Sequence, residues 1–138
     1  MRAGINSQDV VSVYCSLIRT ILEYASPVWH AGLTKTQSDR IEGVQKRCLK
    51  IVFPDLSYDE ALFVSGIEKL SDRRHKHSHD LFNDIKQPGN VLNYLLTPHE
   101  IHSDKKDKLR HIYPYALRRA KTLRLNRSFI TYCINHRF

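Results

Sequence analysis

The sequence predicts an all-α fold, with a bundle of about four helices in residues 1–97 and a basic, mostly irregular tail in residues 98–138. Three observations support this. Apolar residues recur at spacings of three and four along two stretches of the first half, as on one face of an amphipathic helix. A capping-box pattern marks the start of a third helix. From about Pro98 onward the periodicity fades and the chain becomes strongly basic.

The first expected helix starts at Ser7, whose hydroxyl can accept a hydrogen bond from an amide of the first turn. Pro27 ends it near residues 24–26, because the residue before a proline disfavours helical backbone. Its apolar face comprises Val10, Val11, Tyr14, Leu17, Ile18, Ile21, Leu22 and Ala25.

The second expected helix starts from a cap at Thr34 or Thr36 and reaches about Phe53, before Pro54. Its apolar line comprises Ile41, Val44, Cys48 and Ile51. The helix therefore has one face available for packing and another for solvent or a partner.

A basic stripe runs along the other face of this second helix. Arg40, Arg47 and Lys50 lie at i, i+7 and i+10, and Lys46 borders them. Gly43 shares the stripe, although glycine costs about 1 kcal/mol relative to alanine inside a helix. A position without a side chain could admit a phosphate backbone or a packed neighbour.

Two further helices and a short one are expected before the tail. Ser57 and Glu60 form the capping box of the third helix, and Gly66 suits its C-terminal turn. The fourth helix spans residues 71–86, and its first half is very polar. After a turn at Pro88-Gly89, one short helix is expected within residues 91–96.

The charge of the chain favours acidic partners. Its formal net charge is +8 and its sequence pI is about 9.6. Residues 34–53 hold five basic and two acidic residues, net +3, and residues 88–138 hold ten basic and three acidic residues, net +7. Nucleic acid is the commonest partner of such a chain; an anionic membrane surface is the competing one.

Composition also indicates a compartment. The three cysteines, Cys15, Cys48 and Cys133, are widely spaced and odd in number. Residues 1–6 lack the apolar core of a signal peptide, and the longest apolar runs are too short to span a bilayer. We therefore expect an intracellular, soluble protein with reduced thiols.

Four motifs, in residues 14–30, 41–51, 54–62 and 124–130, together resemble the C-terminal region of the reverse transcriptases of Jockey-like non-LTR retrotransposons. The family's stretch downstream of the palm resembles residues 14–30 (YCSLIRTILEYASPVWH). Its next two motifs resemble residues 41–51 (IEGVQKRCLKI) and 54–62 (PDLSYDEAL), in the same order and spacing. Its closing signature is more loosely similar to residues 124–130 (RLNRSFI). The next residue is Thr131, at the position where the family usually has proline.

The resemblance implies a helical thumb and connection region beside a primer–template duplex. The family's metal-binding aspartates lie in a palm upstream of these motifs, and no such paired-aspartate motif occurs in this sequence. Polymerisation needs carboxylates that hold metal ions, expected to be Mg²⁺ in the whole enzyme. We therefore expect no catalysis and no cofactor in this chain alone. The implied partners are RNA or DNA and the missing palm and fingers, in a nuclear or ribonucleoprotein setting.

The candidate nucleic-acid contacts are basic residues that could bind phosphates without reading sequence. The simpler interpretation of the helical stripe is a solvated face beside its own acidic residues. The candidates are Arg40, Lys46, Arg47, Lys50, Arg73, Arg74, Arg118, Arg119, Arg124 and Arg127.

Metal and catalytic alternatives have weaker support in the sequence. His75 and His79 have the i, i+4 spacing of helical zinc ligands, but no cysteine or carboxylate obviously completes a site. Cys133 and His136 have a zinc-knuckle spacing without the other ligands. No catalytic triad or phosphate-binding glycine loop is present. The alternative to nucleic-acid binding is a helical protein-interaction module, or a degenerate element remnant with no activity.

Overall fold

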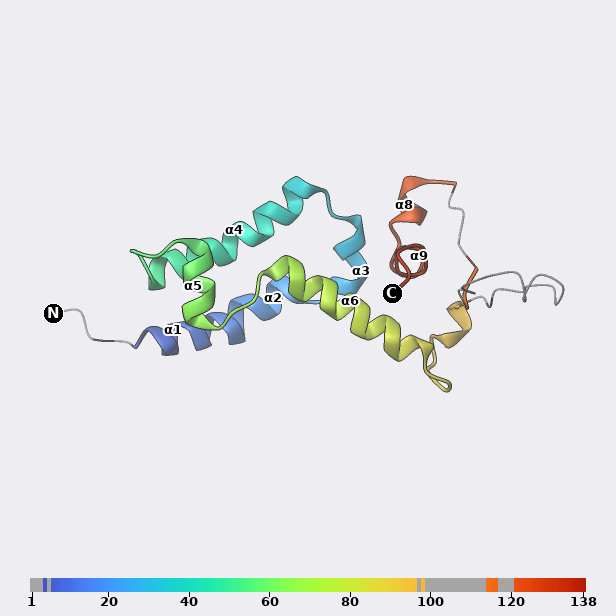
Figure 1. The fold of residues 1–138 in the computed structure, drawn as a ribbon, viewed down its shortest axis with the longest axis horizontal. Coiled ribbons are helices and arrows are strands. Elements are labelled where there is room, and N and C mark those ends of the chain that lie inside the picture. The colour runs from blue at the N-terminus through green and yellow to red at the C-terminus, as the bar shows by residue number, and fades with distance from the viewer. Residues whose placement is uncertain (1–3, 5, 97, 99–113, 117–120) are drawn as a thin grey trace. The chain divides into compact units, whose positions relative to one another are not determined.

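The computed structural model describes residues 4, 6–96, 98, 114–116 and 121–138, which divide into two compact units. Unit 1 comprises residues 1–26 and 33–76, and unit 2 comprises residues 27–32 and 77–138. Figure 1 shows that helices make up most of the described chain. The described residues contain one isolated antiparallel bridge, between Pro98 and Tyr115, and no strand. The all-α prediction is therefore confirmed for them.

Unit 1 begins with one continuous helical segment of changing geometry. It consists of α1 (Ser7–Val13), the π-helical turn η1 (Tyr14–Arg19) and α2 (Thr20–Glu23). Asn6, not Ser7, is the N-cap, because its side chain accepts from the Gln8 amide. The expected helix is present, but it starts one residue away from the expected cap and includes a π turn that was not expected.

Helix α4 (Lys35–Val52) follows its sequence signals closely. Thr34 is the N-cap, and a complete capping box joins it to Gln37. The helix ends at Val52, with Phe53 as C-cap ahead of Pro54. The predicted bounds of this helix are therefore confirmed.

The next helix, α5 (Tyr58–Ser65), lies against the C-terminal half of α4 (Figure 1). Ser57 and Glu60 form the predicted capping box, in which the Glu60 carboxylate accepts from the Ser57 amide at 2.8 Å. Gly66 closes the helix with φ +66°, a left-handed conformation that glycine adopts without a Cβ clash. Both predicted ends of this helix are confirmed.

The core of unit 1 comes from the N-terminal helix, α4 and α5, and from Ile67 shortly after α5. Its members are Val11, Tyr14, Leu49, Ala61, Leu62 and Ile67. Burial of such side chains supplies about 25 cal/mol per Å² of apolar surface. The core therefore holds α4 between the N-terminal helix and α5, and it fixes which face of α4 remains open.

A buried polar network crosses this core. The Gln45 side chain is fully buried; its Oε1 accepts from the Tyr14 hydroxyl at 2.8 Å, and its Nε2 donates to the Tyr58 hydroxyl at 3.0 Å. The Tyr58 hydroxyl donates to Glu42. The Glu42 carboxylate also accepts the backbone amides of Leu70 and Ser71, at 3.2 and 3.1 Å. One network thus joins the N-terminal helix, α4, α5 and the start of the next helix.

Helix α6 (Leu70–Lys86) starts in unit 1 and continues into unit 2. Its start lies one residue before the expected one, where Glu42 accepts two of the amides that a helix N-terminus leaves unpaired. Its end at Lys86 is as predicted. The expected short helix in residues 91–96 is a 3₁₀ turn, η3 (Asn93–Leu95).

Unit 2 contains helical segments that the sequence did not predict. The short helix α3 (Ser26–Trp29) begins at Ser26, the last residue of the first range of unit 1, and has Pro27 in its first turn. It continues as the 3₁₀ turn η2 (His30–Gly32). Two more helices follow near the C-terminus, α8 (Leu123–Asn126) and α9 (Phe129–Asn135). The described residues therefore hold more helical segments than the four expected.

The tail prediction was wrong for residues 121–138. These residues form α8 and α9, and Cys133 and Ile134 are fully buried. They join the core of unit 2, whose buried members are Phe82, Ile85, Leu96, Cys133 and Ile134. A short apolar run was enough to order this segment against the second half of α6.

Within the described part of the chain, every helix is too short or too polar to cross a membrane.

Candidate nucleic-acid interface

The side of α4 that does not enter the core is basic and open to solvent. Arg40, Lys46, Arg47 and Lys50 are all exposed. Leu49, by contrast, is 1% exposed, but the expected apolar line is only partly correct, because Val44 is 40% and Ile51 75% exposed and the polar Gln45 is buried. Four of the ten candidate contacts are therefore available to a partner on one helix.

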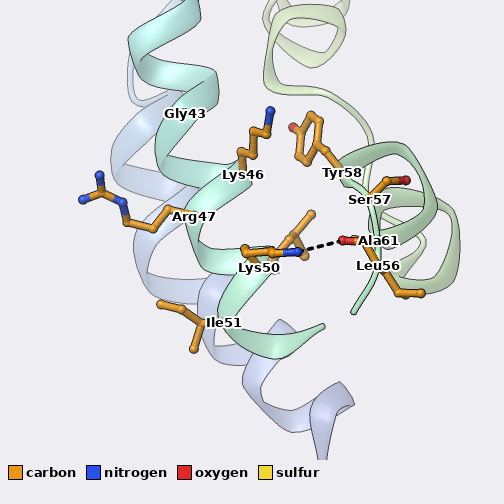
Figure 2. Close-up of a pocket in the computed structure, with 10 residues that line it drawn as sticks. Gly43, Lys46, Arg47, Lys50, Ile51, Leu56, Ser57, Tyr58 and Ala61 are labelled. Carbon is orange, nitrogen blue, oxygen red and sulfur yellow. Dashed lines mark hydrogen bonds between the residues drawn. The ribbon is translucent and has the colours of Figure 1, made fainter. Parts of the chain in front are cut away.

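Three of these cations border a groove between α4 and α5, with a volume of about 650 Å³. Figure 2 shows Lys46 and Lys50 reaching toward α5, with the Tyr58 ring opposite Lys46, whereas Arg47 projects from the other side of α4. Arg40 does not line the groove. The residues that line it are Gly43, Lys46, Arg47, Leu49, Lys50, Ile51, Leu56, Ser57, Tyr58 and Ala61.

Direct contacts hold the groove in shape. The Lys50 ammonium donates to the Leu56 carbonyl at 3.4 Å, and the Lys46 Nζ lies 5.9 Å from the centroid of the Tyr58 ring. The hydroxyl of Tyr58 is bound by Glu42 and Gln45, which fixes the ring. Burial and the hydrogen bond to Glu42 raise the pKa of Tyr58, so it remains a neutral phenol at physiological pH.

Sequence reasoning did not identify the α5 side of this groove. In the sequence, Ser57 is assigned to a capping box, and Leu56, Ser57 and Tyr58 belong to the family motif in residues 54–62, but no pattern marks them as groove residues. The available signal was the position of a tyrosine and a leucine directly beside the capping serine, which places them at the open end of α5.

Arg73 and Arg74 are not part of this basic surface. Arg73 is half-buried; its Nε and Nη2 donate to the two Glu23 carboxylate oxygens, at 2.5 and 3.1 Å. Arg74 is 0% exposed and donates to the Ser38 hydroxyl at 2.9 Å. Burial lowers the pKa of Arg74, against the opposing effect of the Glu42 charge. Both guanidiniums form hydrogen bonds within unit 1, and neither belongs to the exposed basic side of α4.

This assignment predicts a stability effect for Arg73. Replacing Arg73 by alanine should lower the free energy of unfolding by about 1–3 kcal/mol, because the largely buried Glu23 carboxylate loses a charged two-point partner. Arg40→Ala is the matched control and should change it by less than about 0.5 kcal/mol, since Arg40 is exposed. Urea unfolding of the two variants measures this. Equal effects would show that the Arg73–Glu23 pair contributes nothing.

The C-terminal candidates separate into two pairs. Arg124 is exposed, Arg127 is half-buried, and both line a second open pocket of about 490 Å³ in unit 2, together with Val28, Gly32, Leu123 and Ser128. Arg118 and Arg119 lie outside the residues that the structure describes. The looser family motif thus contains two arginines that border one pocket.

The weaker metal candidates do not come together. Among the described residues, no three histidine, cysteine or carboxylate side chains lie close enough to hold one ion. Cys133 is fully buried, and burial raises the pKa of its thiol to about 12, which opposes the thiolate that zinc requires. Cys15 and Cys48 pack against the core of unit 1.

Comparison of this chain with family models, curated proteins and solved structures finds no match.

Proposed function

We propose that this chain is a non-catalytic, nucleic-acid-contacting part of a retrotransposon RNA-directed DNA polymerase, equivalent to its thumb and the segment after it. The supporting observation is the open groove in which Lys46 and Lys50 reach toward α5, with Arg47 at its edge. The motifs in residues 14–62 connect this basic helix with Jockey-like reverse transcriptases.

Binding in this proposal is electrostatic and independent of sequence. Lysine and arginine bind phosphate oxygens, and each neutralised phosphate releases condensed counterions. Affinity for a 12-base-pair RNA–DNA hybrid should therefore fall steeply as the salt concentration rises. The partners would be RNA or DNA together with the palm and fingers of the parent polymerase, and the setting nuclear or ribonucleoprotein-associated.

A charge-reversal pair tests the surface. Arg47→Glu combined with Lys50→Glu should weaken hybrid binding by roughly tenfold or more and lower the salt slope by about 2, because two phosphate contacts are lost. The control is Lys35→Glu combined with Lys76→Glu, which changes the net charge equally at exposed positions outside the groove. Fluorescence anisotropy at several salt concentrations measures both, and circular dichroism checks the helix content.

The two double variants separate three outcomes. If both weaken binding equally, net charge and not the groove determines affinity. If neither does, the contact surface lies elsewhere, and Arg124 and Arg127 become the next residues to reverse. If the unmodified chain does not bind the hybrid at low salt, the proposed function is wrong. DNA synthesis by the purified chain on a primed template would refute its non-catalytic character.

A protein-interaction module is the second candidate. Val13, Leu17 and Ile21 on the N-terminal helix of unit 1 are 55%, 62% and 76% exposed. Exposed apolar side chains on one helix favour a protein contact. A chain that packs on the palm of a polymerase would also need such an apolar surface. The exposed residues therefore favour a protein-interaction module over a nucleic-acid-contacting one only if the chain does not bind the hybrid. A degenerate remnant would show neither activity.

A further inference from the structure

Phosphate contact alone does not account for the floor of the groove between α4 and α5. Leu49, Leu56 and Ala61 give the groove an apolar lining, here called its floor, and Figure 2 shows the Tyr58 ring on the α5 side. A backbone phosphate needs only the cations. A ligand that fills the groove must carry both a negative charge and a flat or apolar part.

We propose that this groove holds one unpaired nucleotide of a single strand, with its phosphate between Lys46 and Lys50 and its base on the apolar floor beside Tyr58. This rests on the proposed function and specifies its ligand. None of the ten lining residues is acidic, so the groove matches an anion. Its volume of about 650 Å³ lies within the roughly 300–1,000 Å³ that small-ligand sites occupy.

The groove selects an unpaired base over a paired one. In a duplex each base face is covered by its neighbours, and a protein must unstack the base before the base can enter a pocket. A single strand offers base faces at no such cost, and proteins bind it through a basic track beside aromatic side chains. The tyrosine is fixed in advance, because Glu42 and Gln45 bind its hydroxyl and leave the ring in the groove wall.

Gly43 keeps this groove open. It stands at i relative to Lys46 at i+3 and Lys50 at i+7, so a side chain there would lie on the same helix face. A Cβ at Gly43 would have no atom within 4 Å, and residues other than proline have a better helix propensity than glycine. We therefore expect a leucine at this position to occupy the groove and to leave the helix intact.

The test compares Gly43→Leu with Gly43→Ala on two ligands, a 12-nucleotide oligo(dT) strand and a 12-base-pair RNA–DNA hybrid. Gly43→Leu should weaken single-strand binding by roughly tenfold, the loss expected when one base contact is removed, and change hybrid binding by less than about twofold. Gly43→Ala adds one methyl group and should leave both affinities within about twofold while raising Tm. Anisotropy gives the affinities, and circular dichroism verifies folding.

Each other outcome overturns the inference. Equal loss on both ligands, or no loss on either, means that no base enters the groove. If Gly43→Leu has no effect while charge reversal at Arg47 and Lys50 still weakens binding, the proposed function stands and this inference fails. If neither oligonucleotide binds the unmodified chain, both fail. An acidic amphipathic peptide that binds, and that Gly43→Leu releases, would assign the groove to a protein.

Discussion

Replacing Gln45 by leucine should lower the free energy of unfolding by about 2–5 kcal/mol, although the two side chains are similar in size. Gln45 is fully buried in unit 1, where its amide bonds to the Tyr14 hydroxyl, the Tyr58 hydroxyl and the Glu68 carbonyl. Leucine can replace none of these bonds.

The cost comes from the partners that remain. The Tyr14 hydroxyl, on a residue only 4% exposed, would lose its acceptor, and the Glu68 carbonyl would lose the Gln45 amide as donor. A buried polar group without a partner costs about 1–3 kcal/mol, more than the bond itself contributed. Tyr58 would be affected less, because its hydroxyl still donates to Glu42.

Chemical unfolding followed by circular dichroism measures this effect. Gln87→Leu is the control, because Gln87 is exposed and follows the end of α6. It should change the free energy of unfolding by less than about 0.5 kcal/mol. A loss below about 1 kcal/mol for Gln45→Leu would mean that the network relaxes around the leucine and does not hold unit 1 together.

Replacing Phe82 by alanine should cost about 3–5 kcal/mol and act mainly on unit 2. Phe82 is 0% exposed in the core of that unit, with the Tyr115 ring centroid 6.2 Å from its own. The Lys86 ammonium lies 5.1 Å above its ring. Alanine removes all of these contacts and leaves a cavity beneath α9.

Local measurements separate this effect from global unfolding. Amides of α9 should lose roughly hundredfold or more in hydrogen-exchange protection, whereas amides of α4 should keep most of theirs. The buried Cys133 thiol should become accessible to alkylation, detected on its own peptide. Val91→Ala, at a residue 84% exposed, is the control and should change neither. Equal loss of protection in α4 and α9 would show that the two units unfold as one.

The sequence predicted those helices whose ends are set by local chemistry. Thr34 and Gln37 cap α4, Ser57 and Glu60 cap α5, and Gly66 ends α5, all through contacts within three or four residues. Such contacts can be read from spacing alone. The start of α6 shows the limit, because its amides are bound by Glu42, 28 residues earlier in the chain.

The same limit explains which candidate contacts were correctly placed on an open surface. Lys46, Arg47 and Lys50 carry charges, which alone favour exposed positions. Periodicity placed the apolar residues of the same helix less well, because Val44 is 40% and Ile51 75% exposed, whereas the polar Gln45 is buried. Arg73 and Arg74 lie in a polar run with thin periodicity, and their burial depends on Glu23 and Ser38, 50 and 36 residues away. No local pattern records a partner at that distance.

The tail was misjudged for a related reason. The seven residues of α9 are too few to show helical periodicity, and a helix of that length is not stable alone in water. What stabilises it is the second half of α6, through Phe82 and Ile85. Order in this segment therefore depends on tertiary packing, which composition cannot reveal.

The π turn at Tyr14–Arg19 sets the register of the N-terminal helix of unit 1. A π turn accommodates one more residue than an α-helix would over the same length of helix. If the same residues adopted α geometry, Glu23 would rotate by about 100° relative to Val11, away from Arg73. Deleting one residue within the turn would instead restore α geometry and keep Glu23 in register with Arg73. Related copies of this sequence should therefore tolerate a one-residue deletion here better than a one-residue deletion elsewhere in this helix.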